Sequence, residues 1–230
     1  MVRLSELAEL AGEPLQAYRL VNSKFPPVAL FDDVADADEF EVLYQIQELT
    51  NPRLKNEVGR LELIRRSEIP FGIPGCSYAT APFTHVNPAG SRFSDGRFGV
   101  LYLADTLETA LAEVKHHQSL YWSNVPDLNY ERFVFRGLFC SFVDAGMKDA
   151  TSIAMTDPVY DPDDYTHSRH LGKLVKSAGC PGLRYNSVRM HGSHCWALMT
   201  PKPVLSVVQA AHYEMIWNGQ VTSVSQISEA

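Results

Sequence analysis

Residues 87–117 read NPAGSRFSDGRFGVLYLADTLETALAEVKHH and predict a loop, a short strand and a helix in succession. The loop carries three glycines within ten residues, which permit tight turns and close approach of the backbone to a ligand. The apolar run VLYLA at 100–104 is too short for a helix and predicts a buried strand. Asp105 with Glu108 three residues later predicts a capping box that opens the helix. This stretch therefore predicts a loop, a strand and a helix that lie next to one another.

Each of these elements carries one chemically distinctive side chain. Arg92 in the loop offers a planar fork for phosphate or carboxylate, and Tyr102 in the strand offers an aromatic face with a hydroxyl. Glu113 falls at the edge of the apolar helix stripe, where a half-buried carboxylate can meet a developing positive charge. Taken singly, the three also suit a surface charge, a core aromatic and a solvated helix residue paired with His117. The residues alone leave both readings open.

The same motifs carry a resemblance to a known family. They are Gly-Ser-Arg-Phe at 90–93, Leu-Tyr-Leu-Ala at 101–104 and Ala-Leu-Ala-Glu at 110–113, followed by GLRYNSVR at 182–189 and Cys-Trp-Ala-Leu at 195–198. In this order they resemble the RES domain, the toxin half of RES-Xre toxin–antitoxin modules of bacteria, from about residue 69 to about residue 219. The resemblance does not extend to residues 1–65.

The resemblance implies a fold and a reaction. The fold is α+β, an ADP-ribosyltransferase-like core of small β-sheets around a cleft with outer helices. The reaction consumes NAD by splitting its nicotinamide–ribose bond, and the acceptor is water, phosphate or a side chain of a target protein. The resemblance assigns Glu113 to the developing ribose cation, Arg92 to the diphosphate, and Tyr102 to the nicotinamide or ribose. It places Ser187, with Asn186 beside it, in the same pocket.

The resemblance also implies an upstream arginine in the pocket. Only Arg65 or Arg66 is considered for that place, and the spacing to Arg92 is long for the family. His85 lies in the Pro- and Gly-rich segment that precedes the loop, where it is either a hydrogen-bonding loop residue or part of the NAD site. No G-x-G-x-x-G opens a βαβ unit, so a Rossmann dinucleotide site is disfavoured.

Partners follow from the resemblance and from charge. A toxin of this kind implies a helix-turn-helix antitoxin of the Xre type. A formal charge of −7 argues against direct binding of nucleic acid. Two alternatives stay open: an inactive module that only binds the antitoxin, and an RNA-cleaving toxin that uses His116 and His117. A homodimer within a larger complex is compatible with the sequence, which does not choose an oligomeric state.

Element patterns predict two parts in the 230-residue chain. Residues 1–65 predict an all-helical extension, and residues 66–230 predict the RES catalytic domain. Helices are expected at 4–10, 35–49 and 53–64 in the extension and at 166–178 in the catalytic domain. Strands are expected at 129–143, 183–188, 194–199, 204–209 and 213–217. The segment after residue 219 is expected to be loose.

Cysteine spacing and hydropathy argue against a metal-binding, a membrane-spanning or a secreted protein. The four cysteines contain no C-x-x-C pair, so we expect reduced thiols and no metal site. No apolar run approaches the length of a membrane span, and the charged N-terminus does not resemble a signal peptide. We therefore expect a cytoplasmic protein without membrane contact.

Overall fold

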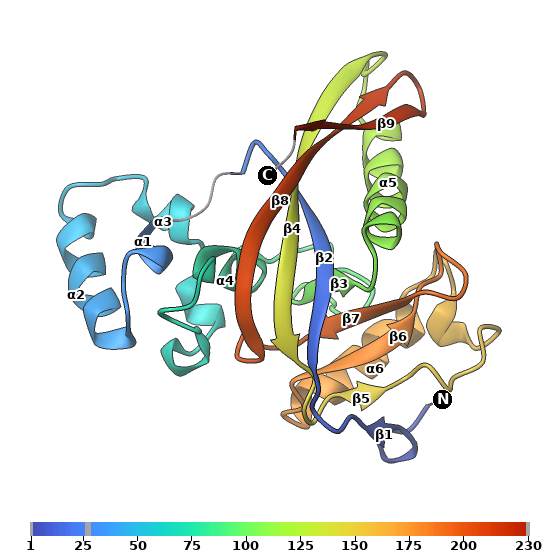
Figure 1. Ribbon diagram of the computed structural model, residues 1–230, viewed down its shortest axis with the longest axis horizontal. Coiled ribbons are helices and arrows are strands. Elements are labelled where there is room, and N and C mark those ends of the chain that lie inside the picture. Colours follow the sequence, from blue (N-terminus) through green and yellow to red (C-terminus); the bar gives the residue numbers. More distant parts are fainter. Residues whose placement is uncertain (1, 26–28, 229–230) are drawn as a thin grey trace.

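A computed structural model describes residues 2–25 and 29–228, and its largest feature is one nine-stranded sheet (Figure 1). The strand order is β1-β5-β6-β7-β3-β2-β4-β8-β9. Neighbouring strands are antiparallel except β5 and β6, which are parallel. The strands are β1 (Ala8–Glu9), β2 (Pro14–Asn22), β3 (Leu101–Ala104), β4 (Glu131–Val143), β5 (Lys148–Asp149), β6 (Gly182–Asn186), β7 (His194–Leu198), β8 (Val204–Trp217) and β9 (Val221–Ser228).

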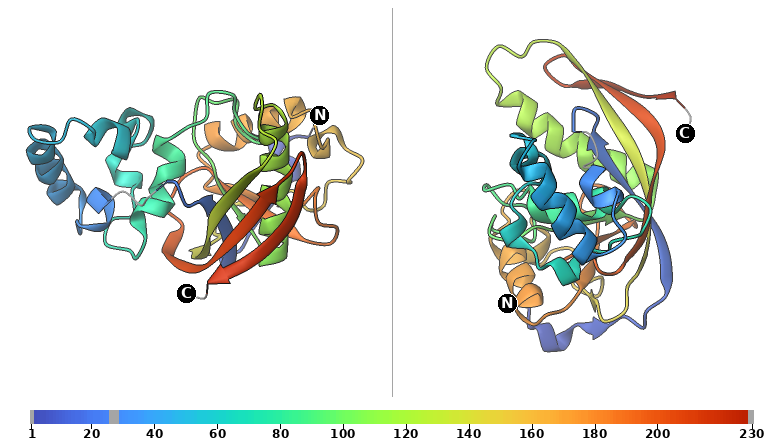
Figure 2. Two further views of the ribbon diagram at one scale, coloured as in Figure 1. Left: turned by 90° about the horizontal axis from the view of Figure 1, so that it is seen from above. Right: turned by 90° about the vertical axis from the view of Figure 1, so that its left-hand side faces the viewer.

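Six α-helices and four short 3₁₀ turns surround this sheet in the described part of the chain. They are α1 (Ala29–Asp32), α2 (Ala37–Glu48), α3 (Leu54–Val58), α4 (Cys76–Thr84), α5 (Leu107–Ser123) and α6 (Thr166–Ser177), with η1 (Leu4–Glu6), η2 (Leu61–Leu63), η3 (Arg66–Glu68) and η4 (Pro158–Tyr160). Figure 2 shows α1 and α2 projecting to one side of the molecule, away from α5 and α6. The expected α+β class is confirmed.

The sheet has two halves that meet at a single residue pair between β2 and β3. That pair is Tyr18 with Ala104. On one side of it the long strands β2, β4, β8 and β9 pair along most of their length, and on the other the shorter β3, β7, β6, β5 and β1 follow. A single residue pair therefore joins the two halves of the sheet.

Two apolar clusters pack against the sheet, and each includes residues from both of its halves. Helix α5 packs Trp122 against the long strands, with its ring stacked on Phe133 at 3.8 Å between centroids and edge-on to Trp217 at 5.7 Å. The N-terminal helices form a second cluster, in which Phe31 and Phe40 stack at 5.2 Å and pack with Leu138 of β4. Burial of large aromatic side chains therefore anchors both groups of helices.

The prediction of an all-helical N-terminal part is wrong for its first third. Residues expected as a helix at 4–10 form η1 and β1 instead, and β2 lies in the middle of the sheet between β3 and β4. Strand β2 pairs along its whole length with β4, more than a hundred positions later. Such pairing is non-local, so a search for helical periodicity does not detect it. The expected helices near α2 and α3 are confirmed, although α3 is shorter than predicted.

Three other elements differ from the predictions. The two strands expected at 204–209 and 213–217 are one continuous strand, β8, with a register shift where it passes Gly137 of β4. The tail expected to be loose forms the edge strand β9. The Pro- and Gly-rich segment after residue 65 contains helix α4, with Pro82 inside it. No helix among residues 2–25 and 29–228 is both long and apolar enough to cross a membrane.

Candidate functional site

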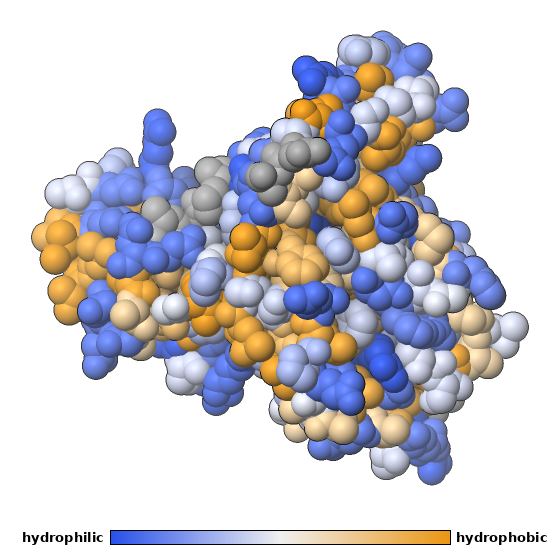
Figure 3. Space-filling view, in the orientation of Figure 1, coloured by the Kyte–Doolittle hydropathy of each residue, from blue (hydrophilic) through white to orange (hydrophobic). Residues whose placement is uncertain are grey.

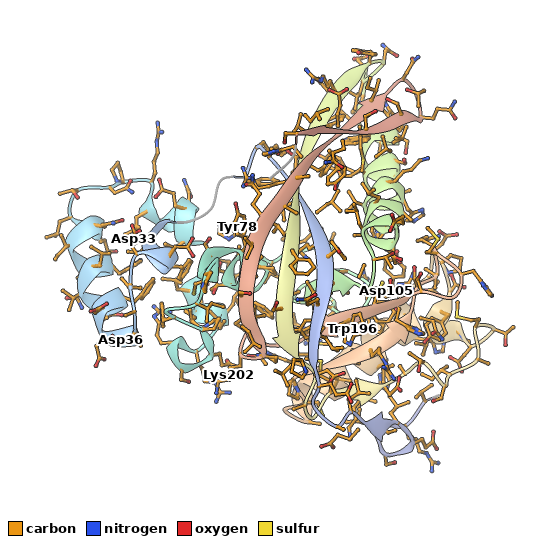
Figure 4. The ribbon with its side chains drawn as sticks, viewed as in Figure 1. Asp33, Asp36, Tyr78, Asp105, Trp196 and Lys202 are labelled. Carbon is orange, nitrogen blue, oxygen red and sulfur yellow. The ribbon has the colours of Figure 1, made fainter. Side chains whose placement is uncertain are left out.

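Helix α5 presents Glu113 toward the loop that follows β6. The helix begins at Thr106, whose Oγ1 accepts a hydrogen bond from the backbone N of Thr109 at 3.1 Å. The predicted cap, Asp105, has another role: its Oδ2 accepts from the backbone N of His194 at 2.7 Å and so ties the start of α5 to β7 (Figure 4). Thr106 is therefore the N-cap, and the expected Asp105–Glu108 capping box is wrong.

Ser187 is the immediate partner of Glu113. Its hydroxyl donates to Glu113 Oε1 at 2.6 Å, across 74 positions of sequence. The same Oγ accepts from the backbone N–H groups of Arg189 and Met190, each at 3.1 Å. Ser187 is 2% exposed, whereas the Glu113 side chain is 20% exposed. The backbone turn after β6 thus fixes the serine, and the serine fixes one carboxylate oxygen while the other faces outward toward His117 Nε2 at 3.9 Å.

Tyr102 anchors the glycine-rich loop to β3. Its hydroxyl lies 2.8 Å from Ser91 Oγ and accepts from the backbone N of Phe93 at 2.9 Å. Burial raises the pKa of Tyr102 to about 12, although the hydrogen bonds from Ser91 and Phe93 and the charge of Arg92 act in the opposite direction. The phenol therefore stays neutral at physiological pH and serves as a fixed hydrogen-bonding group.

Arg92 is more deeply enclosed than its position in a loop suggests. It is 6% exposed, and its guanidinium lies over the ring of Tyr165 at 4.5 Å. Its Nη1 donates to the carbonyl oxygens of Asp161 at 2.9 Å and Val159 at 3.5 Å. Within the described residues, Nε and Nη2 have no hydrogen-bond partner. Arg92 therefore holds the segment around η4 in place, and its Nε and Nη2 keep their N–H groups for another acceptor.

The pKa shifts of His116 and Tyr185 both include contributions from the charges of Glu113 and Arg92. Desolvation lowers the pKa of His116, followed by the charge of Arg189, while Asp163 and Glu113 raise it and Arg92 lowers it. Burial of Tyr185 raises its pKa, and the charges of Glu113 and Arg92 act on that hydroxyl as well. The two charges therefore act on the same pair of side chains.

The pKa of His117, the residue after His116, is also lowered, which favours its neutral form. Desolvation lowers its pKa first, then the neighbouring His116 and the cations Arg189 and Arg92. Because the side chain is 48% exposed, we expect solvent to screen much of this effect. Both shifts favour the neutral imidazole, whereas the guanidinium groups of Arg92 and Arg189 keep their charge.

The sequence comparisons place this arrangement in a family. A family model described as "RES domain" matches residues 69–218. The chain belongs to the RES domain family. An uncharacterized protein, y4oC of Sinorhizobium fredii, is 30% identical over 209 residues, which cover 88% of this chain and 83% of that protein. A chain in the crystal structure of the M. tuberculosis MbcT–MbcA toxin–antitoxin complex aligns with a TM-score of 0.48 and 12% identity, over 86% of this chain and 85% of that chain.

Three residues predicted for the pocket of this RES domain lie elsewhere or have other partners. Arg66 packs over the ring of Phe40 and donates to a backbone carbonyl near η2, within the N-terminal helical cluster. His85 ends α4 and lies 3.2 Å from the carbonyl of Asn56. Asn186 precedes Ser187, but its side-chain amide donates to the Thr151 carbonyl and its Oδ1 accepts from His194 Nδ1. These hydrogen bonds stabilise the end of β6. Neither Arg66 nor His85 belongs to the group around Glu113.

Two further arginines of this RES domain, Arg169 and Arg189, hydrogen-bond to the segments around Arg92. Arg169 of α6 donates to the carbonyls of Ser91 and Ala89 at 3.0 and 2.9 Å and clamps the glycine-rich loop. Arg189 donates to the carbonyl of Pro162 at 2.6 Å, and its Nε is buried without a partner among the described residues. Arg189 is the second of two arginines in the family motif GLRYNSVR, so the motif carries a signal for it. Nothing local marks Arg169, whose contacts span about eighty positions.

One further arginine reinforces the junction of the two half-sheets. Arg19 of β2 donates through Nη1 to the carbonyl of Tyr102 at 3.0 Å, next to the single Tyr18–Ala104 pair. Desolvation lowers its pKa. No carboxylate pairs with it among the described residues, and the same part of the chain has no group of three or more His, Cys, Asp or Glu side chains placed to hold a metal ion.

Proposed function

We propose that this RES domain cleaves the nicotinamide–ribose bond of NAD and acts as the toxin of a toxin–antitoxin module. The observation that carries the proposal is the Ser187–Glu113 hydrogen bond, with Arg189 two residues after Ser187 and with Arg92 acting electrostatically on the nearby His116. Among the described residues, both guanidinium groups keep N–H groups without a partner. One fixed carboxylate among cations suits a substrate with an anionic diphosphate and a ribose that becomes cationic as its bond breaks.

The proposed roles follow the geometry of each group. Loss of nicotinamide develops oxocarbenium-like charge on the ribose, as in glycoside hydrolysis, and Glu113 stabilises that charge. Ser187 keeps the carboxylate in one rotamer, so it is a positioning residue. Arg92 offers Nε and Nη2 to a diphosphate oxygen, and Tyr102 keeps the loop that carries Arg92 against β3. The acceptor of ADP-ribose is water, phosphate or a protein side chain, and the helix-turn-helix antitoxin stays a proposal from family membership.

The test is an assay of free nicotinamide with purified protein and NAD, in the presence and absence of phosphate and of a protein extract. Glu113→Gln keeps the size of the side chain and removes its charge, so we expect the rate to fall by about 100-fold or more. Glu108→Gln, on an exposed position of the same helix, is the matched control and is expected to leave the rate unchanged. The absence of nicotinamide release by the wild type, or equal rates for Glu113→Gln and wild type, contradicts the proposal.

A further inference from the structure

Helix α2 lies in the most acidic part of the chain. Between Phe25 and Pro52 the sequence has seven acidic residues and no basic one. They are Asp32, Asp33, Asp36, Asp38, Glu39, Glu41 and Glu48. Figure 4 shows Asp36 at the start of this helix and Asp33 by the end of α1. From the segments that follow, Lys55 lies 3.4 Å from Glu48 and Arg66 lies 4.0 Å from Glu41, so two of the seven charges are paired in this way.

The same helix exposes an apolar stripe on its outer side. Val42, Ile46 and Leu49 are 59%, 56% and 87% exposed, and Leu49 continues the helical turn directly after α2. At about 100° per residue the three fall within roughly 60° of one another and opposite Phe40, which is buried against the core. Figure 3 shows the corresponding apolar surface over α2 at the left-hand edge of the molecule. Helix α2 is therefore apolar on both sides, and only one side is covered.

The spacing of this stripe fits the seam between two helices. Positions i, i+4 and i+7 are those that meet a partner helix in paired helices. A contact of two helical turns is small, so the affinity expected is in the micromolar range. The charges select the occupant. A second copy of α2, a nucleic acid or an anionic membrane would each bring negative charge against the acidic residues around the stripe, whereas a basic helix would neutralise them.

We propose that α2 is a docking surface for a basic amphipathic helix of a partner protein. The apolar face of that helix covers Val42, Ile46 and Leu49, and its Lys or Arg residues face the acidic residues on either side of the stripe. The surface is independent of NAD cleavage, because α2 lies with the N-terminal helices, away from the side of the molecule that holds α5 and α6 (Figure 2).

The experiment uses the full chain and a labelled synthetic helix as the probe. The peptide is three heptads long, about 21 residues, with leucine at the a and d positions and lysine elsewhere, and a twin peptide has glutamate in place of lysine. Fluorescence anisotropy is measured at about 50 mM and about 300 mM NaCl. We expect binding of the lysine peptide that weakens with salt, and at least about tenfold weaker binding of the glutamate peptide.

Matched variants decide whether α2 is the site. Val42→Gln, Ile46→Gln and Leu49→Gln together keep helix propensity and remove the stripe, and we expect about tenfold or greater loss of affinity. Leu205→Thr with Val208→Thr changes two β8 residues of similar exposure, 50% and 52%, and is expected to retain binding. Equal affinity of the α2 variant and the wild type overturns the proposal. Self-association of the wild type that the α2 variant abolishes also overturns it, because the occupant is then a second copy.

Discussion

The Ser187–Glu113 contact yields the sharpest prediction, because the chain contains a second contact of the same kind away from Glu113. Ser77 of α4 donates through its Oγ to Asp32 Oδ2 at 2.6 Å, the distance found between Ser187 and Glu113. The two serines are 1% and 2% exposed. Ser187→Ala and Ser77→Ala therefore remove equivalent serine–carboxylate hydrogen bonds, one at the proposed site and one beside the N-terminal helices.

The magnitudes follow from what each hydroxyl contacts. A hydrogen bond to a charged group contributes about 1.5–3 kcal/mol to stability, which is the loss expected for Ser77→Ala. Ser187 also accepts from the backbone N–H groups of Arg189 and Met190, so its loss is expected to reach about 2–4 kcal/mol. Release of Glu113 from its fixed rotamer is expected to lower the rate of nicotinamide release by about 10- to 100-fold.

The assay combines chemical denaturation with nicotinamide release at saturating NAD, at a temperature where both variants are folded. We expect both variants to lose stability and only Ser187→Ala to lose activity. Full activity of folded Ser187→Ala would refute the positioning role of Ser187. An equal loss of activity in Ser77→Ala would show that activity falls because the whole protein is destabilised.

Three further predictions test the surroundings of the site. Tyr102→Phe is expected to destabilise the fold by about 1–2 kcal/mol and to slow NAD cleavage without changing its pH profile between about pH 6 and pH 9, because the buried phenol has a pKa of about 12 and is neutral throughout; a new inflection in the profile would contradict this. Gly172→Ala is expected to cost at least about 2 kcal/mol in thermal or chemical unfolding, because a Cβ on this α6 residue would overlap the carbonyl of Phe93, and unchanged stability would show that the loop yields freely. For Asp149, desolvation opposes ionisation, but hydrogen bonds from Arg184 and a neighbouring threonine outweigh it and lower the pKa. The ionised carboxylate therefore stabilises the fold above about pH 4, this contribution is lost as the pH falls through the lowered pKa, and Asp149→Asn is expected to flatten the decline of unfolding free energy below about pH 4.

Short-range patterns predicted much of the site. The loop, β3 and α5 follow from glycine spacing, a short apolar run and a helical stripe, all of which act within a few residues. The family motifs added Ser187, which contacts Glu113 in the structure. Local patterns wrongly predict Asp105 as the helix cap. In the structure Asp105 accepts a hydrogen bond from the backbone of His194 in β7, and that contact depends on strand pairing and not on local sequence.

Long-range pairing explains the remaining errors. Proximity in sequence to the loop favours Arg65 or Arg66 as the upstream arginine, yet Arg66 packs on Phe40 in the N-terminal cluster. The arginine next to Tyr102 is Arg19, on a strand that was predicted to lie in a helical extension. Proximity in sequence says little about proximity in a sheet whose central strands come from opposite ends of the chain.

The sequence by itself determined the family, the α+β class and the order of loop, strand and helix around Arg92, Tyr102 and Glu113, because propensity, glycine positions and motifs act over short distances. Only the tertiary structure decided that β2 enters the middle of the sheet, that Arg92 is enclosed against Tyr165, and that α2 leaves an apolar stripe uncovered. Those features depend on which distant segments exclude water from one another, and that is fixed only when the whole chain packs.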